Sequence, residues 1–296
     1  MQKQNILNGG FILLTIKLKV DLKTLMSSLF NLKPCKNDIG AFIETDLRKV
    51  EYANIIAIRK AVRKYGAVFF RNQNLDSKNY VKFAKKIGKC ASYPRLRGLE
   101  GFPEITVVEK KADEELMFGE GWHTDSTYTK NPPEFTMLYS IKTPQKGKGN
   151  TKFASQYASY ENLSKDYKEK INNLSALFSA DGPISKTVIN RTEERGRDID
   201  PKSLSAIHSI VRTNNENSKK SIYLSPGHVI KITDVLESEG TSILNYLTAH
   251  QVKPEFVYEF EWEPDCLALW SNYAMLHSPV NDFTGLERIM HRITIK

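Results

Sequence analysis

The sequence has few cysteines and no long apolar run, and each lack excludes a class of protein. Its 296 residues include only three cysteines, which lie far apart and form no CxxC pair. This spacing indicates neither a disulfide framework nor a zinc knuckle, and it fits a reducing, cytoplasmic setting. The only apolar run near the N-terminus, residues 10–16, has about half of the ~20 residues that a membrane span needs, and lysines follow it instead of a cleavage site. We therefore predict no signal peptide and no membrane partner.

Other familiar signatures are also missing. The chain has no internal repeat, no GxGxxG or Walker motif, and no linker rich in proline, glycine or serine. With 40% hydrophobic residues it can bury a sizeable core. We therefore expect one domain at residues 36–296. It follows an N-terminal extension, residues 1–35, whose order the sequence leaves open.

The charge of the chain is positive but scattered. Lysine and arginine outnumber aspartate and glutamate by 43 to 34, which gives a formal net charge of +9. The lysines form no basic stripe with interleaved aromatic residues, so we predict no nucleic-acid partner. A basic protein can still attract an anionic small molecule by electrostatic steering.

Apolar spacing predicts helices first and then short strands. Residues 52–65 have a helical period that ends at Gly66, residues 67–70 read as a buried strand, and Asp76 or Ser77 can cap a second helix. Further strands are expected at residues 105–108, 135–141, 221–224, 257–262, 267–270 and 288–295, and further helices at residues 163–177 and 230–249. This order indicates a mainly β protein with flanking helices, a double-stranded β-helix or cupin-like jelly roll. The polar stretch at residues 190–202 is expected to be a loop or lid.

The segment GWHTD at residues 121–125 is a candidate metal site. In an extended chain, alternate side chains point to the same face, so His123 and Asp125 can bind one cation. A second histidine would complete a 2-His-1-carboxylate triad, which leaves open positions on iron(II). An HxD pair alone is a weak signal, because it often occurs by chance.

A second segment strengthens this interpretation. Residues 269–277 read as a strand that runs into a loop, with His277 at its end. On the strand that follows, Arg288 and Arg292 share one face. A buried guanidinium without a partner costs several kcal/mol, so an inward face of this kind needs an anion. A dicarboxylate could bind one arginine through a bidentate fork, and a salt bridge to aspartate or glutamate is the alternative.

Seven short motifs occur together and in one order along the chain. They are YGAVFFRNQ (65–73), WHTD (122–125), NPP (131–133), GNT (149–151), VRT (211–213), KPEF (253–256) and RIMHR (288–292). With these motifs the chain resembles the taurine dioxygenase and 2,4-dichlorophenoxyacetate dioxygenase family of iron(II)- and 2-oxoglutarate-dependent enzymes. The resemblance extends from about residue 38 to residue 295.

The resemblance implies a role for each matching residue. His123, Asp125 and His277 would be the catalytic iron(II) ligands. Thr151 would form a hydrogen bond with 2-oxoglutarate, and Arg288 would pair with its distal carboxylate.

The implied substrate site agrees with the family in part. Arg292 matches an arginine that reaches the substrate anion in taurine-type members, and Asn272 lies on the strand that leads towards the second histidine ligand. Tyr93 stands where those members have a substrate-binding histidine, and Gly119 stands where they have an asparagine. We expect Arg292, Tyr93 and Asn272 to bind a substrate other than taurine.

The resemblance implies hydroxylation of a small anionic organic substrate: a sulfonate, phosphonate, sulfate ester or carboxylate. O2 and 2-oxoglutarate would be cosubstrates, and succinate and CO2 would be released. Two alternatives stay open, a non-catalytic small-molecule-binding protein on the same fold and a metal-dependent hydrolase, although a hydrolase would leave Thr151 and Arg288 without a function. Family members often form dimers or tetramers, and the sequence leaves the oligomeric state open.

Overall fold

The computed structural model describes residues 29–188, 196–197 and 199–296. The apolar run at residues 10–16, and residues 190–195 and 198 of the expected polar loop, lie outside the described residues. Among the described residues, no helix is long and apolar enough to cross a membrane.

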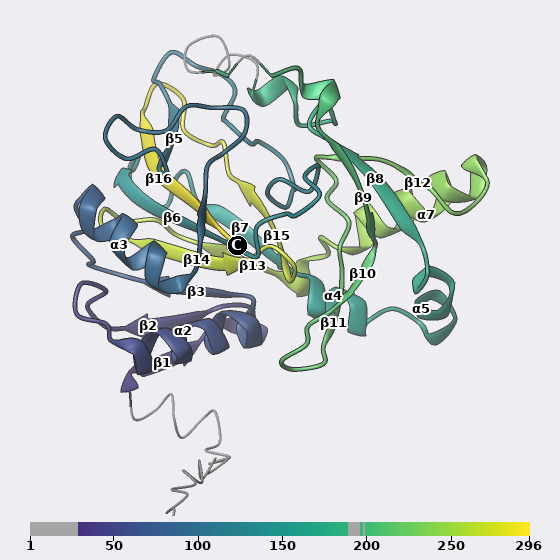
Figure 1. The fold of residues 1–296 in the computed structure, drawn as a ribbon, viewed down its shortest axis with the longest axis horizontal. Helices are drawn as coiled ribbons and strands as arrows, with labels where there is room; N and C mark the ends of the chain where they lie inside the picture. Colours follow the sequence, from purple (N-terminus) through teal and green to yellow (C-terminus); the bar gives the residue numbers. More distant parts are fainter. Residues whose placement is uncertain (1–28, 189–195, 198) are drawn as a thin grey trace, which may run out of the picture.

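A large, mostly antiparallel sheet forms one wall of the molecule (Figure 1). Its strands run in the order β1–β2–β3–β14–β6–β16–β4, and β5 also pairs with β16. Their bounds are β1 (Asn31–Pro34), β2 (Ala41–Glu44), β3 (Ala67–Phe70), β14 (Leu267–Ser271), β6 (Phe135–Lys142), β16 (Arg288–Ile295), β4 (Cys90–Ala91) and β5 (Thr106–Lys110). Strand β1 lies within the predicted extension, and the domain boundary at residue 35 stays a prediction.

A smaller sheet faces the large one. It has the order β13 (Val257–Phe260), β7 (Thr151–Ser155) and β15 (Met275–Pro279). The two sheets meet through aromatic side chains, because the ring of Phe69 stacks 4.3 Å from that of Phe260 and lies 5.5 Å from that of Phe153. Two sheets packed face to face are the arrangement of a jelly roll, as predicted.

The alternation of side chains along each strand explains why both faces of the large sheet are covered. On β3, Val68 and Phe70 pack against the helices α2 (Tyr52–Tyr65) and α3 (Ser77–Ile87). Ala67 and Phe69 point the other way, into the space between the sheets. The helices therefore cover the outer face, and the inner face is left to the site.

Local signals set the ends of both helices. Helix α2 ends at Gly66, whose φ of +79° favours glycine. Asp76 caps α3, because its carboxylate accepts a hydrogen bond from the Asn79 amide at 2.7 Å. Both predicted ends are confirmed.

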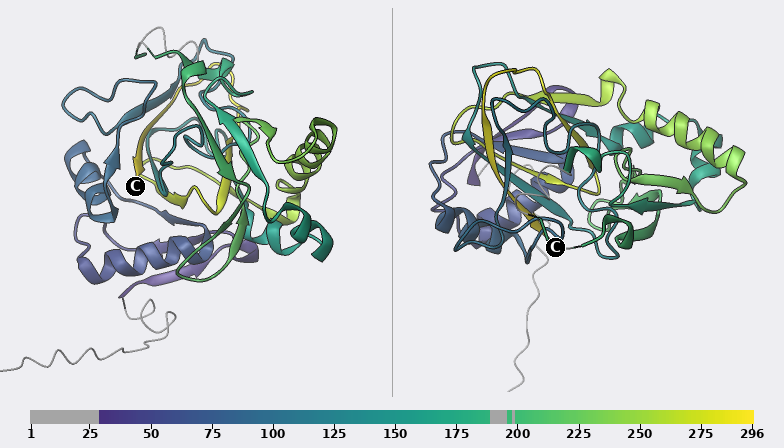
Figure 2. Two further views of the ribbon diagram at one scale, coloured as in Figure 1. Left: turned by 45° about the vertical axis from the view of Figure 1, so that its right-hand side comes forward. Right: turned by 90° about the horizontal axis from the view of Figure 1, so that it is seen from above.

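A third layer lies on the far side of the molecule from α2 and α3, as both views of Figure 2 show. It contains a three-stranded sheet, a two-stranded hairpin and three helices. The sheet is β12 (Val229–Ile232), β8 (Ser175–Ser179) and β9 (Ser205–Ser209), the hairpin is β10 (Val211–Thr213) and β11 (Lys220–Ile222), and the helices are α4 (Gln156–Glu161), α5 (Lys165–Ile171) and α7 (Glu237–His250). Short 3-10 helices span Lys36–Asp38, Pro201–Ser203 and Pro254–Phe256.

Two predicted helices were wrong over part of their length. The helix expected at residues 163–177 ends at Ile171, and residues 175–179 form strand β8 instead. The helix expected at residues 230–249 begins only at Glu237, because the β-branched segment before it forms strand β12. Strand β8 buries alternate residues, Ala176 and Phe178, whereas β12 buries Val229 and Ile232, which are three residues apart, a spacing that also occurs on one face of a helix.

Candidate iron and 2-oxoglutarate site

His123 and His277 are held side by side by their own backbones. The amide of each donates a hydrogen bond to the carbonyl of the other, at 2.9 Å in both directions. His277 does not follow a strand into a loop, as predicted, but lies within the separate strand β15, after a turn that follows β14. The reason is that β15 pairs with β7, a strand that the sequence pattern did not reveal. The two imidazole rings are 4.1 Å apart between centroids.

With Asp125 these residues form one buried group. The candidate ligand atoms of His123, Asp125 and His277 all lie within 4.8 Å of one another. The His123 Nδ1 atom is 2.9 Å from the Gly121 carbonyl oxygen, so Nδ1 carries the proton and Nε2 keeps its lone pair for a metal. The structure therefore brings together the three residues predicted from the sequence.

The protonation of the group fits a divalent cation. Burial lowers the pKa of His123, and it lowers the pKa of His277 well below its ordinary value, so both imidazoles are neutral. Burial by itself would raise the pKa of Asp125, but the nearby Arg292 guanidinium and the two imidazoles outweigh it and lower that pKa. Two neutral imidazoles and one carboxylate are the donor set that non-haem iron(II) accepts.

A small cavity on one side of this group, the cosubstrate chamber, is lined by His123, His277, Trp270, Thr151 and Arg288. The Arg288 side chain is buried, and its pKa is lowered by burial to about 10, so it stays charged at neutral pH. Its Nη2 atom lies 3.4 Å from Thr151 Oγ1, and its Nε has no partner. Among the described residues, no carboxylate pairs with Arg288.

A second cavity, the substrate chamber, adjoins the first. It shares His123 and Arg292 with the first cavity and is also lined by Asp125. The Arg292 guanidinium lies 4.4 Å from the centre of the Tyr93 ring, which places these two predicted residues together. Its Nη1 donates to Asp125 Oδ1 at 3.0 Å, so the salt bridge that the sequence left open is present. Its Nε and Nη2 are buried without a partner.

The comparisons with known proteins agree with this geometry. Residues 31–294 match the signature of the family described as taurine catabolism dioxygenase TauD, TfdA family. The chain belongs to this family. It is 27% identical over 260 residues to the alpha-ketoglutarate-dependent sulfonate dioxygenase of Saccharomyces cerevisiae, a match that covers 84% of this chain and 60% of the yeast protein.

The matches to two further relatives cover more of those proteins' length. The chain is 25% identical to the alpha-ketoglutarate-dependent sulfate ester dioxygenase of Pseudomonas putida, over 86% of this chain and 84% of that one. The solved structure of a taurine dioxygenase from Burkholderia xenovorans is 28% identical, with a TM-score of 0.75 over 90% of each chain. The jelly-roll fold, the dioxygenase class and the cofactors of the class, iron(II), 2-oxoglutarate and O2, are therefore confirmed.

In this dioxygenase a chain of hydrogen bonds holds the Asp125 carboxylate in place. Thr136 Oγ1 donates to Asp125 Oδ2 at 2.7 Å, and Asn272 Nδ2 donates to Thr136 Oγ1 at 2.9 Å. Because the amide donates to the threonine oxygen, the single hydroxyl hydrogen is directed at the carboxylate. The indole N–H of Trp270 fixes the amide in turn, by donating to Asn272 Oδ1 at 3.2 Å.

This position corrects the prediction for Asn272. Its side chain lines neither the cosubstrate chamber nor the substrate chamber, since its amide is used by Thr136 and Trp270. In the structure the residue contacts Asp125 only indirectly, through Thr136, and lies outside both chambers. Gly119, the other departure from the family pattern, lies beside His123, where an added Cβ would be 3.2 Å from the imidazole Cε1.

Sequence reasoning missed four residues of the substrate chamber: Ser126, Tyr128, Ile184 and His228. The first two directly follow the WHTD motif, so their place in the sequence could have indicated them. His228 gave no such signal, because only the fold brings its Nδ1 within 3.0 Å of Thr127 Oγ1. Burial lowers the pKa of His228 to about 3, so it is a neutral hydrogen-bonding group in the wall.

Proposed function

We propose that this dioxygenase hydroxylates a small organic anion, foremost a sulfonate or a sulfate ester, and releases succinate and CO2. One observation carries the proposal: two buried arginines on the same face of β16 line the cavities that adjoin the His123–Asp125–His277 group. Two anions, a cosubstrate and a substrate, would satisfy them. The relatives named as sulfonate and sulfate ester dioxygenases support this substrate class.

We assign the binding roles as follows. His123, Asp125 and His277 would hold iron(II), and Arg288 with Thr151 would hold the distal carboxylate of 2-oxoglutarate. Iron(II) with 2-oxoglutarate and O2 supplies the oxidising power for hydroxylation of a carbon centre. The buried ligand imidazoles stay neutral and available for the metal, because their surroundings disfavour protonation.

Binding of the substrate anion would depend on Arg292. Its free Nε and Nη2 can donate to the substrate anion while Nη1 remains on Asp125. The rings of Tyr93 and Phe118 lie against the guanidinium, at 4.4 and 5.4 Å from their centres, and limit its contact with water. Water exclusion strengthens each ionic contact inside the chamber.

The two alternative functions fit the site less well. A metal-dependent hydrolase would leave the buried Arg288 without a counter-charge, and a non-catalytic binding protein would not need the complete ligand group. The three cysteines are free, in keeping with the proposed cytoplasmic location. A homodimer or homotetramer stays a prediction.

The test is succinate release from 2-oxoglutarate with iron(II) and O2, across a panel of sulfonates, sulfate esters, phosphonates and carboxylates. We expect at least one sulfonate or sulfate ester to stimulate release, and Asp125→Ala to abolish it. Stimulation only by carboxylates would refute the proposed substrate class. Turnover of an ester with zinc and without 2-oxoglutarate would favour the hydrolase.

A further inference from the structure

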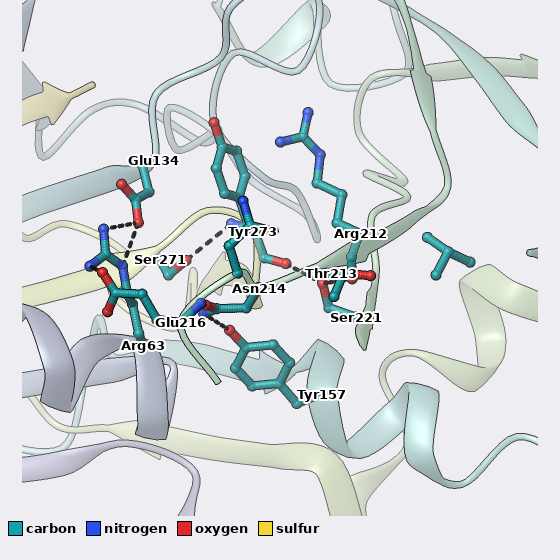
Figure 3. A pocket seen from close by; sticks show the side chains of 12 residues that line it. Arg63, Glu134, Tyr157, Arg212, Thr213, Asn214, Glu216, Ser221, Ser271 and Tyr273 are labelled. Atoms are coloured by element: carbon teal, nitrogen blue, oxygen red, sulfur yellow. Dashed lines mark hydrogen bonds and ion pairs between the residues drawn. The ribbon is translucent and has the colours of Figure 1, made fainter. Parts of the chain in front are cut away.

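A third cavity, of about 590 Å³, shares no lining residue with the cosubstrate and substrate chambers (Figure 3). Its walls come from α2, from the segment before β6, from the β10–β11 hairpin and from the turn between β14 and β15. That volume lies within the range of pockets that bind small molecules. None of its lining residues has a role in the proposed dioxygenase reaction.

Arg212 is the residue of this cavity that could bind a ligand through its charge. Its guanidinium packs against two tyrosine rings, 4.1 Å from the centre of Tyr223 and 4.2 Å from that of Tyr273. The two rings lie nearly perpendicular to each other, with centroids 5.8 Å apart, so they pack against adjacent sides of the guanidinium and leave its N–H groups available to a ligand in the cavity. Among the described residues, no carboxylate forms an ion pair with Arg212 and no acceptor forms a hydrogen bond with its guanidinium.

The other charged groups of the cavity pair with one another. Arg63 forms ion pairs with Glu134, at 2.8 Å, and with Glu216. Figure 3 shows this cluster and Arg212 on opposite sides of the cavity. Both glutamates pair with Arg63, and neither forms an ion pair with Arg212. A cation fixed by two rings, facing a cavity and lacking a counter-ion, is a preorganised anion site.

We propose that this cavity binds a small organic anion, a carboxylate or a phosphate, through the N–H edge of Arg212. Both anions present two oxygens at the spacing of the guanidinium fork. Nearby polar groups can add hydrogen bonds, since Asn215 and Thr213 line the same cavity and are exposed. The proposal does not rest on the proposed dioxygenase activity.

The test is isothermal titration calorimetry of the metal-free full chain with inorganic phosphate and with citrate, at physiological salt. We expect saturable binding of at least one probe, weakened about tenfold or more in Arg212→Gln, because a charge-assisted bidentate contact is lost. Binding of phosphate alone or citrate alone would identify the anion class.

Matched variants distinguish binding of the probe in this cavity from binding of the probe elsewhere on the protein. Lys165→Gln makes the same charge change on an exposed helix, and Arg288→Gln makes it in the cosubstrate chamber. Lys165→Gln should bind the probe as the wild type does, and the binding that Arg212→Gln weakens should persist in Arg288→Gln. If Lys165→Gln lowered the affinity for the probe as much as Arg212→Gln does, the loss would be due to the change in net charge alone, and the proposal would be overturned. Loss of binding in Arg288→Gln with binding retained in Arg212→Gln would assign the probe to the cosubstrate chamber and also overturn it.

A second variant keeps the test decisive if Arg212→Gln does not fold. Asn215→Asp adds a negative charge at the exposed lining of the cavity and leaves the tyrosine stack intact. It should weaken binding of the same probe, and unchanged affinity would contradict the proposal. Absence of binding by either probe to the wild type at millimolar concentration would also overturn it. Because no metal is present, these outcomes are independent of turnover.

Discussion

At the scale of single residues, Arg288 and Arg292 differ although they share one strand face. Arg292 already has a carboxylate partner, because its Nη1 lies 3.0 Å from Asp125 Oδ1. Arg288 is equally buried but has only the Thr151 hydroxyl, 3.4 Å away. A buried charge without a counter-charge destabilises the protein, so the cosubstrate carboxylate would complete the site.

Arg288→Gln should raise the KM for 2-oxoglutarate at least about 30-fold, because losing one partner of a buried ionic contact costs about 2 kcal/mol or more. Iron affinity should change little, since Arg288 does not contact the ligand group. Succinate release at varied 2-oxoglutarate measures the effect, with Lys165→Gln as the control. An unchanged KM would remove Arg288 from the cosubstrate site.

Thr136→Val should weaken metal binding about 10- to 100-fold, as expected when a hydrogen-bond partner of a ligand is removed. Titration of the metal-free protein with Mn(II) or Co(II) measures this without turnover. Thr136→Ser keeps the hydroxyl and should retain the affinity. Thr294→Val removes another buried hydroxyl, one bonded to the Ala91 carbonyl, and serves as the control. Equal losses in the two valine variants would mean that Thr136 is only a packing residue.

At the scale of elements, α7 stabilises the third layer of the fold without lining the cosubstrate chamber. Leu247 and Ile243 are buried against apolar side chains of β8 and β12. The cosubstrate chamber is lined by other elements, chiefly β7, β14, β15 and β16. Stability and metal binding are therefore separable in this layer.

Leu247→Ala should lower the free energy of unfolding by about 2–5 kcal/mol, because it leaves a cavity in this apolar cluster. Urea denaturation measures the loss, and Leu236→Ala, at an exposed position just before α7, should have little effect. Metal affinity of the folded variant should stay near that of the wild type. A large fall in metal affinity would show that α7 and the site are coupled.

The elements also show how far the sequence was informative. The bounds of β16 were predicted fully, since its eight residues alternate clearly, and Gly66 identified the end of α2. The short strands β8 and β12 were predicted in part as helix, because three apolar residues in a segment of four or five fit either period. The candidate iron ligands were predicted from motifs, whereas the place of His228 depends on a contact across 101 residues that no local pattern contains.

At the scale of the whole molecule, burial keeps most histidines neutral. It lowers the pKa of His123, His208, His228, His277 and His291. In the unfolded chain these side chains return to ordinary values near 6.5, so below that pH the unfolded state binds more protons than the folded state. The resulting stability is present above the unfolded pKa and is lost as the pH falls towards the folded values.

The metal-free protein should therefore lose stability as the pH falls from about 6.5 to 5, by up to about 1.4 kcal/mol per pH unit for each histidine. Urea denaturation at several pH values measures this slope. Because His208 and His291 lie outside the ligand group, His208→Gln and His291→Gln should each reduce the slope without removing a ligand. A flat profile across this range would contradict the burial of neutral histidines.

The most direct test of the central claim, that His123, Asp125 and His277 hold iron beside a 2-oxoglutarate site, is an anaerobic titration. Iron(II) is added to the metal-free protein, then 2-oxoglutarate, and the visible absorption is recorded. We predict a weak charge-transfer band that requires both additions and is absent from His277→Ala. A folded, iron-loaded wild type that shows no band on addition of 2-oxoglutarate would contradict the account.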